Sequence, residues 1–162
     1  MPEDIRVVEN VTIDLERAQG RLRNLRPVFM GPVLDDLLAT EAAIFANAGG
    51  VAGTDKWEPL ADSTLNRKTR NARSTRIMVD RGDLERSLIE RGAEGQVARM
   101  VGPATFEFGT EVTNDRGEQF AIYHQLGTRT MPARQVVPDE WPDEDVERWG
   151  DIAVEYVMEG RL

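Results

Sequence analysis

The chain of 162 residues lacks cysteine altogether. No disulfide can therefore hold the fold, and no thiolate is present to bind a metal ion. Long apolar runs are missing as well, since none approaches the ~18 residues that a membrane-spanning helix requires. The acidic start, Met1-Pro2-Glu3-Asp4, also lacks the basic-then-apolar layout of a secretory signal. These absences predict no membrane span and synthesis in the cytoplasm, for a chain whose length suits one domain with a modest core.

Recognisable catalytic patterns are missing too. His124 is the only histidine, and it would orient a nucleophile such as Ser87 only if the fold brought the two together. A lone histidine near a glycine is more often a structural hydrogen-bonding group. The glycine-rich run 49–53 lacks the Lys-Ser/Thr pair that completes a phosphate-binding loop. We therefore expect no enzyme activity and no cofactor.

One carboxylate cluster keeps an enzymatic alternative open. Asp80, Asp83 and Glu85 carry the oxygen ligands that Mg²⁺ or Ca²⁺ prefers. Asp80 and Asp83 are more typical of residues that cap a junction between a strand and a helix. A small metal-dependent hydrolase that uses these three residues is therefore the alternative from another functional class.

Charge is unevenly distributed along the chain. The net charge of -9 argues against a general nucleic-acid binder, because neutralised phosphates supply most of that affinity. Residues 66–76 nevertheless carry five basic side chains and no acid, whereas residues 139–162 carry nine acids against two arginines. Segments of opposite charge attract each other within one subunit or between neighbours.

Hydrophobic periodicity predicts an α+β fold in which an N-terminal strand and helices pack on a small, mostly antiparallel sheet, with a C-terminal helix. Apolar residues alternate over 5–15, as in a half-buried strand, and then follow helical spacing. That helical stripe consists of Leu15, Ala18, Leu22 and Leu25, and we expect it to be core. Gly31-Pro32 should break the helix. A second helix is expected to carry an apolar face from Leu34 to Phe45.

The remainder reads as loops and short elements. Residues 49–75 predict a long exposed loop with Trp57 as its apolar anchor, and loops of this length are usually functional or mobile. Further elements are expected in chain order: a strand over 76–79, a short helix from Gly82-Asp83, strands over 96–101 and 105–110, a helical turn or strand over 120–125, and a helix from Asp143 that has Trp149 in the core. We expect one domain over 1–137 and an acidic helical extension over 138–162.

Four short signatures follow one another in the middle of the chain. The first is Trp57-Glu58-Pro59-Leu60, with Thr64 and Lys68 at four-residue steps beyond it. The others are Asp80-Arg81-Gly82-Asp83-Leu84, then His124-Gln125-Leu126-Gly127, and finally Pro132-Ala133-Arg134. Each signature is weak alone, but the order of the four argues against a chance match.

In this order the signatures resemble the tail-completion and virion-morphogenesis proteins of tailed bacteriophages, over most of the chain up to Arg134. The positions that carry the resemblance are Trp57, Pro59, Leu60, Thr64, Lys68, Asp80, Gly82, Leu84, His124, Gln125, Gly127, Pro132, Ala133 and Arg134. The chain departs from the family at Arg81, where a small hydroxyl residue is frequent. It departs again at Gln135-Val136, where proline and an aromatic or aliphatic residue are usual, and the acidic tail after Pro138 is particular to this chain.

The resemblance implies a structural protein of the virion that acts in the phage neck. Such a protein forms a ring, commonly six-fold, and joins the tail to the head around the DNA channel. Its partners would be copies of itself, a head-side connector or adaptor, and the tail-tube or tail-terminator proteins, while DNA passes without sequence-specific binding. A tail terminator that caps the tail tube is the alternative within this class. A monomeric module that holds an acidic partner on its basic loop is a third hypothesis.

Within this interpretation the candidate residues fall into two groups. The candidates for subunit or partner interfaces are Trp57, Pro59, Leu60, Thr64, Arg67, Lys68, Arg70, Arg73, Arg76, His124, Arg134, Trp141, Asp143, Glu144 and Glu147. The candidates for a structural role in the motifs are Asp80, Gly82, Asp83, Leu84, Gly127 and Pro132. A contact between two different patches closes into a ring when its rotation fits, and the basic segment 67–76 and the acidic segment 139–159 are our candidates for those patches.

Overall fold

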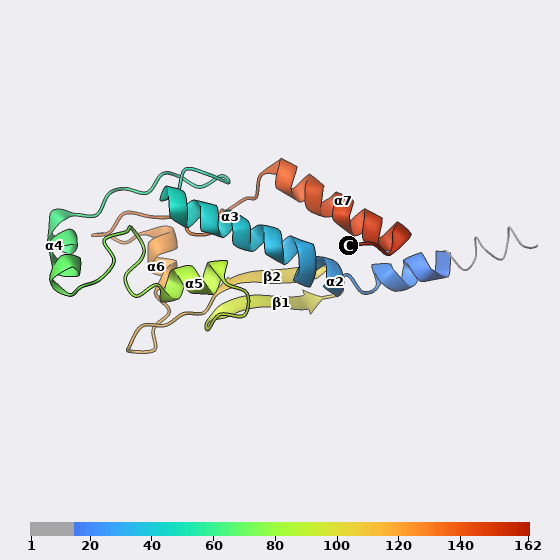
Figure 1. Cartoon of the computed structure of the whole chain (residues 1–162), viewed down its shortest axis with the longest axis horizontal. Helices are drawn as coiled ribbons and strands as arrows, with labels where there is room; N and C mark the ends of the chain where they lie inside the picture. The colour runs from blue at the N-terminus through green and yellow to red at the C-terminus, as the bar shows by residue number, and fades with distance from the viewer. Residues whose placement is uncertain (1–14) are drawn as a thin grey trace, which may run out of the picture. The chain divides into compact units, whose positions relative to one another are not determined.

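The computed structural model describes residues 15–162, so the strand expected from residue 5 lies outside the described residues. The α+β class is correct, because helices accompany a two-stranded sheet of strands β1 and β2 (Figure 1). The described chain divides into two compact units. The first unit holds residues 15–35, 99–107 and 143–162, and the second holds 36–98 and 108–142.

The first unit opens with helical backbone over 15–22 and the short helix α2 (Arg26–Val28). The predicted break at Gly31-Pro32 is confirmed. Within the π-type turn η1 (Phe29–Val33), Gly31 adopts a non-helical φ of -105° and ψ of -112°. Pro32 lacks an amide N–H and clashes with the preceding turn, which explains why the helix cannot run through. Phe29 stacks on Phe106 with ring centroids 5.6 Å apart.

The apolar stripe that was expected in the core is largely exposed. Leu25 is buried, but the side chains of Leu15 and Leu22 are 65% and 57% exposed. The prediction was wrong for these two leucines. Helical spacing places residues on one face, but it does not specify what covers that face.

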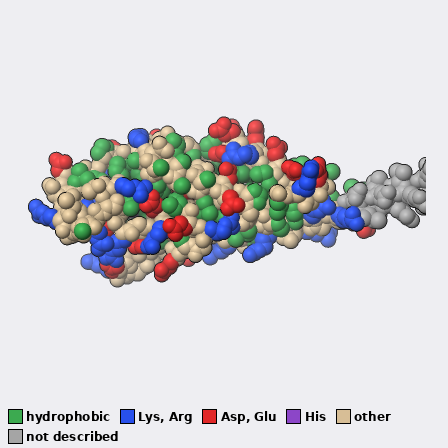
Figure 2. Space-filling model, in the orientation of Figure 1, with side chains coloured by type: hydrophobic (Ala, Val, Ile, Leu, Met, Phe, Trp, Pro, Cys, Tyr) green, Lys and Arg blue, Asp and Glu red, His purple; other side chains and the backbone are tan. Residues whose placement is uncertain are grey.

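The predicted C-terminal helix is confirmed as α7 (Asp143–Glu159). It carries seven acids and one arginine and has no buried residue, and Figure 2 shows acidic side chains gathered over it. Trp149 is half-buried rather than core. Arg21 donates from Nη1 to the Val157 carbonyl at 2.6 Å, which satisfies a carbonyl of the last helical turn with a cation.

The second unit has the larger apolar core. The apolar face of α3 (Leu34–Asn47) supplies Ile44 and Phe45 to a buried cluster. The other members of this cluster come from loops and from α5: Trp57, Val79, Leu84, Leu88 and Val136. Most of the core is therefore brought together from segments that are distant in sequence, so the loops must be held in place for the core to form.

Glu41 is a buried carboxyl on α3 that sequence reasoning did not single out. Glu41 is 0% exposed, and neither of its carboxyl oxygens has a hydrogen-bond partner among residues 15–162. Burial raises the pKa of Glu41 to about 9, so the carboxyl is protonated at neutral pH. The sequence does carry a signal for this burial, because Glu41 lies at helical spacing between Leu37 and Ile44, on the apolar face of α3.

The segment expected to be a long exposed loop contains the helix α4 (Asp62–Arg70). The prediction failed because the helix has few apolar residues to reveal its period, and its buried side is marked instead by Lys68. The expected strand over 76–79 is also wrong, since that stretch forms bends and turns. Buried Trp57 does anchor the segment, as predicted.

The remaining elements follow the sequence pattern closely. Helix α5 (Asp83–Ile89) starts at the Gly82-Asp83 step and buries Leu84 and Leu88. The predicted hairpin is confirmed as β1 (Gln96–Gly102) paired with β2 (Thr105–Thr110). The stretch 120–125, which fitted either a helical turn or a strand, forms the helix α6 (Ala121–Leu126).

Candidate functional site

Trp57, from the first signature, lies in the core of the second unit. Its indole is 3% exposed and meets the Phe45 ring edge to face at 5.4 Å. Its Nε1 donates to the Gln135 carbonyl at 2.8 Å, and its backbone N donates to the Ala48 carbonyl at 2.8 Å. Trp57 was expected at an interface, but its ring and its polar atom are both used inside the chain.

Lys68 is the second internal anchor of this region. Its side chain is 5% exposed, and Nζ donates to the carbonyls of Val79 at 2.6 Å and Arg76 at 3.0 Å. Burial lowers the pKa of Lys68, and the nearby charge of Asp80 partly opposes that effect. The ammonium group therefore holds the turn over 76–79 from the side of α4, which makes Lys68 a structural residue rather than a surface contact.

Arg134, from the fourth signature, binds back to the first. Its guanidinium donates from Nε to the Glu58 carbonyl at 3.0 Å and from Nη2 to the Pro59 carbonyl at 3.2 Å. Its backbone N donates to the His124 carbonyl at 2.7 Å. With 6% exposure, Arg134 is also internal. Arg134 thus ties together three of the four signatures, the first through its side chain and the third through its backbone.

Gln125 and Gly127 of the third signature hold the fourth signature and the residues directly after it. The Gln125 Oε1 accepts from the backbone N of Val136 at 3.0 Å, and Nε2 donates to the Val137 carbonyl at 2.7 Å. Gly127 adopts φ 72° and ψ 178°, which is essentially a glycine-only conformation. A Cβ at this position would lie 2.7 Å from the Ala133 backbone N. The close approach of the two loops therefore depends on glycine.

The second signature forms the junction that starts α5. Gly82 takes a left-handed φ of 90° directly before the helix, and Leu84 is buried beneath it. Arg81, a departure from the family pattern, pairs with Asp115 through two hydrogen bonds of 2.8 and 2.9 Å. This pairing lowers the pKa of Asp115 chiefly through the hydrogen bond from Arg81.

Two of the three carboxylates of the hydrolase alternative are paired with arginines. Glu85 accepts two hydrogen bonds from Arg76, and Asp83 pairs with Arg86. Within residues 15–162, no group of three acidic, histidine or cysteine side chains is arranged to hold a metal ion. The described arrangement therefore gives the hydrolase alternative no support.

The four signatures line one cavity of about 730 Å³. Each contributes to it, through residues such as Leu60, Leu84, His124 and Pro132, together with the turn at 113–115. His124 Nδ1 is buried and has no hydrogen-bond partner within the described residues. Burial, and secondarily the charge of Arg134, lowers the pKa of His124, so the imidazole is neutral at pH 7.

Ser87, the nucleophile considered for His124, is bonded to other residues. Ser87 donates to the Leu84 carbonyl at 2.8 Å and shares a 2.8 Å hydrogen bond with Thr110, and it is fully buried. The Ser87–His124 arrangement considered from the sequence is therefore not formed by these bonds. The site consists of side chains that hold loops to one another around a cavity.

The exposed candidates lie outside this bonding network. Arg67 and Arg70 stand on the exposed face of α4, and Asp143, Glu144 and Glu147 are exposed on α7. Pro59, Leu60 and Thr64 border the cavity, and Trp141 is half-buried. Arg73 is half-buried, while Arg76 is committed to Glu85.

Comparison with protein-family models, with curated proteins and with solved structures found no match to this chain. Among residues 15–162, no helix combines the length and the apolar character needed to cross a membrane.

Proposed function

We propose that this chain is a structural protein of the phage neck, which assembles into a ring and joins the tail to the head around the DNA channel. The observation that carries the proposal is the convergence of the four signatures. Although they are spread between Trp57 and Arg134, they line one cavity, and Arg134 bonds directly to two of the other three. Signatures that depend on one another physically are expected to recur together and in order, as they do in the phage family that this sequence resembles.

The chemistry of the site is compatible with this role. The polar side-chain atoms of Arg134, Lys68 and Gln125 form hydrogen bonds with backbone groups within the chain. A buried donor that satisfies a loop carbonyl contributes stability and a defined loop position. Such a scaffold suits a protein whose work is done by surfaces.

A ring requires two different patches that fit each other. The exposed basic face of α4 and the acidic helix α7 are oppositely charged and belong to one chain. The basic face of one copy can therefore bind the acidic helix of the next copy around a ring. A largely acidic body also lets DNA slide through a channel without adhering to it.

A tail terminator that caps the tail tube is the second candidate. It has the same support, because the resemblance covers proteins of both roles. The two roles differ in the particles that accumulate when the protein is missing.

Electron microscopy of lysates from the parent phage, with this gene inactivated, tests the proposal. We expect filled heads beside unattached tails of normal length, and restored particles when the intact gene is supplied in trans. Tails of uncontrolled length would move the assignment to a terminator. Intact, infectious particles without the gene would overturn both roles.

A further inference from the structure

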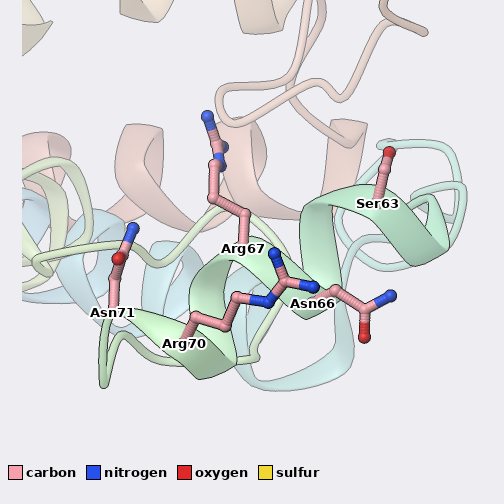
Figure 3. Close-up of a pocket in the computed structure, with 5 residues that line it drawn as sticks. All are labelled: Ser63, Asn66, Arg67, Arg70 and Asn71. Carbon is pink, nitrogen blue, oxygen red and sulfur yellow. The ribbon is translucent and has the colours of Figure 1, made fainter.

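One exposed face of α4 carries side chains with hydrogen-bond donors: arginines, amides and a hydroxyl. Five residues at helical spacing line a shallow cleft of about 440 Å³: Ser63, Asn66, Arg67, Arg70 and Asn71. Figure 3 shows these side chains on one side of α4 and the turn after it, with the Arg70 guanidinium directed toward Asn66. No carboxylate lines the cleft.

The basic side chains of residues 66–76 fall into two groups, those bonded within the chain and those exposed to solvent. Lys68 binds the carbonyls of Arg76 and Val79, and Arg76 binds Glu85. Arg67 and Arg70 are exposed, and neither guanidinium group forms a hydrogen bond or ion pair within residues 15–162. On α4 itself, these two arginines are therefore the basic side chains left to meet a partner.

Two guanidinium groups set among amides and a hydroxyl fit carboxylates or phosphates, which guanidinium binds through paired hydrogen bonds. Carboxylates are available on the same chain. Helix α7 exposes Glu144, Glu147 and Asp151 at spacings that place them along one face. These three acids have no ion pair within residues 15–162, whereas Asp145 is paired with Arg148.

Resting on the proposed ring, we propose that Arg67 and Arg70 of one copy bind Glu147 and Asp151 on α7 of the neighbouring copy. Both arginines lie one helical turn apart, and so do both acids, so two parallel charge pairs can form. The contact joins two different patches, which is the type of contact that closes a ring.

DNA is the competing occupant of this face, and the charge of the chain argues against it. Two arginines per copy release few counterions, while a net charge of -9 repels a polyphosphate. A neighbouring α7 meets the same arginines with carboxylates at matched spacing, so the partner of choice is a second copy of this chain.

The test is a charge swap in the phage that lacks the gene, with variants supplied in trans and infectious titre as the readout. R67E/R70E and E147R/D151R place like charges opposite each other, and each should lower the titre about 100-fold or more. The four-fold variant R67E/R70E/E147R/D151R restores opposite charges and should return the titre to within about tenfold of wild type. Glu147 and Asp151 are chosen over Asp143 and Glu144 because an arginine in the first helical turn would oppose the helix dipole.

Co-expression of the two double variants tests whether the contact joins different copies. Neither variant pairs with itself, but copies that alternate around an even-numbered ring place an arginine opposite an acid at every interface. We expect the mixture to restore titre. The control R116E/R129E makes the same change in net charge as R67E/R70E, at exposed arginines elsewhere, and should leave the titre unchanged. Thermal melting of each purified variant checks its folding.

Three outcomes would overturn this contact. Full titre with R67E/R70E would mean that the α4 face is not an interface. Loss without rescue by the four-fold variant would mean that this face binds something else, such as DNA. Rescue by the four-fold variant but not by the mixture would place the contact within one copy. The proposed function fails separately, if phage without the gene is infectious with no variant supplied.

Discussion

The loops of the second unit and helix α7 of the first unit satisfy their backbone hydrogen-bonding groups in different ways. In α7 the backbone polar groups bond along the helix, so the side chains are left for the surface and none is buried. Around the cavity, backbone groups of loops that no helix or sheet satisfies are bonded instead by side chains, such as Lys68 of α4, Gln125 of α6 and Arg134.

This contrast shows why the most recognisable residues need not be the ones that meet a partner. Trp57, Lys68 and Arg134 stand out in the sequence, yet all three are buried. Arg67 and Arg70 flank Lys68 on the same helix and are exposed. The signatures therefore identify the scaffold, while the proposed contact lies beside them.

The largest expected effect comes from Trp57. Trp57→Ala removes a nearly buried ring and its hydrogen bond to Gln135, and should lower the free energy of unfolding by about 3–5 kcal/mol. Urea denaturation followed by circular dichroism measures the loss. Trp149→Ala on α7, where the ring is only half-buried, should cost clearly less. Equal losses would remove the contrast between the two regions.

Glu41 contrasts with the exposed acids of α7 through its pH dependence. Its pKa in the folded protein, about 9, lies above the ordinary value of 4.5, so the folded state binds the extra proton between these values. The contribution of Glu41 to stability is therefore fully present below pH 4.5 and is lost as the pH rises toward 9, with a loss of about 3 kcal/mol by pH 7.

Glu41→Gln cannot ionise, so its gain in unfolding free energy over wild type should grow by about 3 kcal/mol between pH 4.5 and 7. Urea titrations at both pH values measure this difference. Glu147→Gln, on exposed α7, serves as the control and should show little growth. A pH-independent difference for Glu41→Gln would contradict the buried neutral carboxyl.

Within α4, substitutions of Lys68 and Arg70 should differ in their effect on the free energy of unfolding. Lys68→Met keeps the aliphatic stem but leaves the carbonyls of Arg76 and Val79 without their donor, so a loss of about 2–3 kcal/mol is expected. Arg70→Met changes an exposed side chain and should alter stability by no more than about 0.5 kcal/mol. Thermal and urea unfolding compare the pair, and similar losses would mean that Lys68 is not the internal anchor.

The smallest effects come from two glycines and should have opposite signs. Gly127→Ala forces a Cβ to within 2.7 Å of the Ala133 backbone N and should cost about 1–3 kcal/mol. Gly150→Ala lies inside α7 with open space around it, so it should stabilise by about 0.5–1 kcal/mol through helix propensity. A destabilising Gly150→Ala would show that α7 depends on contacts at that position.

Prediction from the sequence succeeded where a period or a turn signal was strong. The hairpin, α5, α7 and the break at Gly31-Pro32 all follow from apolar spacing or from glycine and proline chemistry. Helix α4 was missed because its buried side is marked by a lysine. The exposure of Leu15 and Leu22 was missed because spacing does not reveal which faces are covered.

The sequence by itself determined the helices and hairpin that local spacing encodes, the separation of a basic from an acidic segment, and the four ordered signatures. Only the tertiary structure decided that Lys68 and Arg134 face inward, that Glu41 is buried and neutral, and that Arg67 and Arg70 are exposed. The physical reason is that burial and hydrogen-bond partners depend on segments distant in the chain. The carbonyl that Trp57 meets, for example, belongs to Gln135.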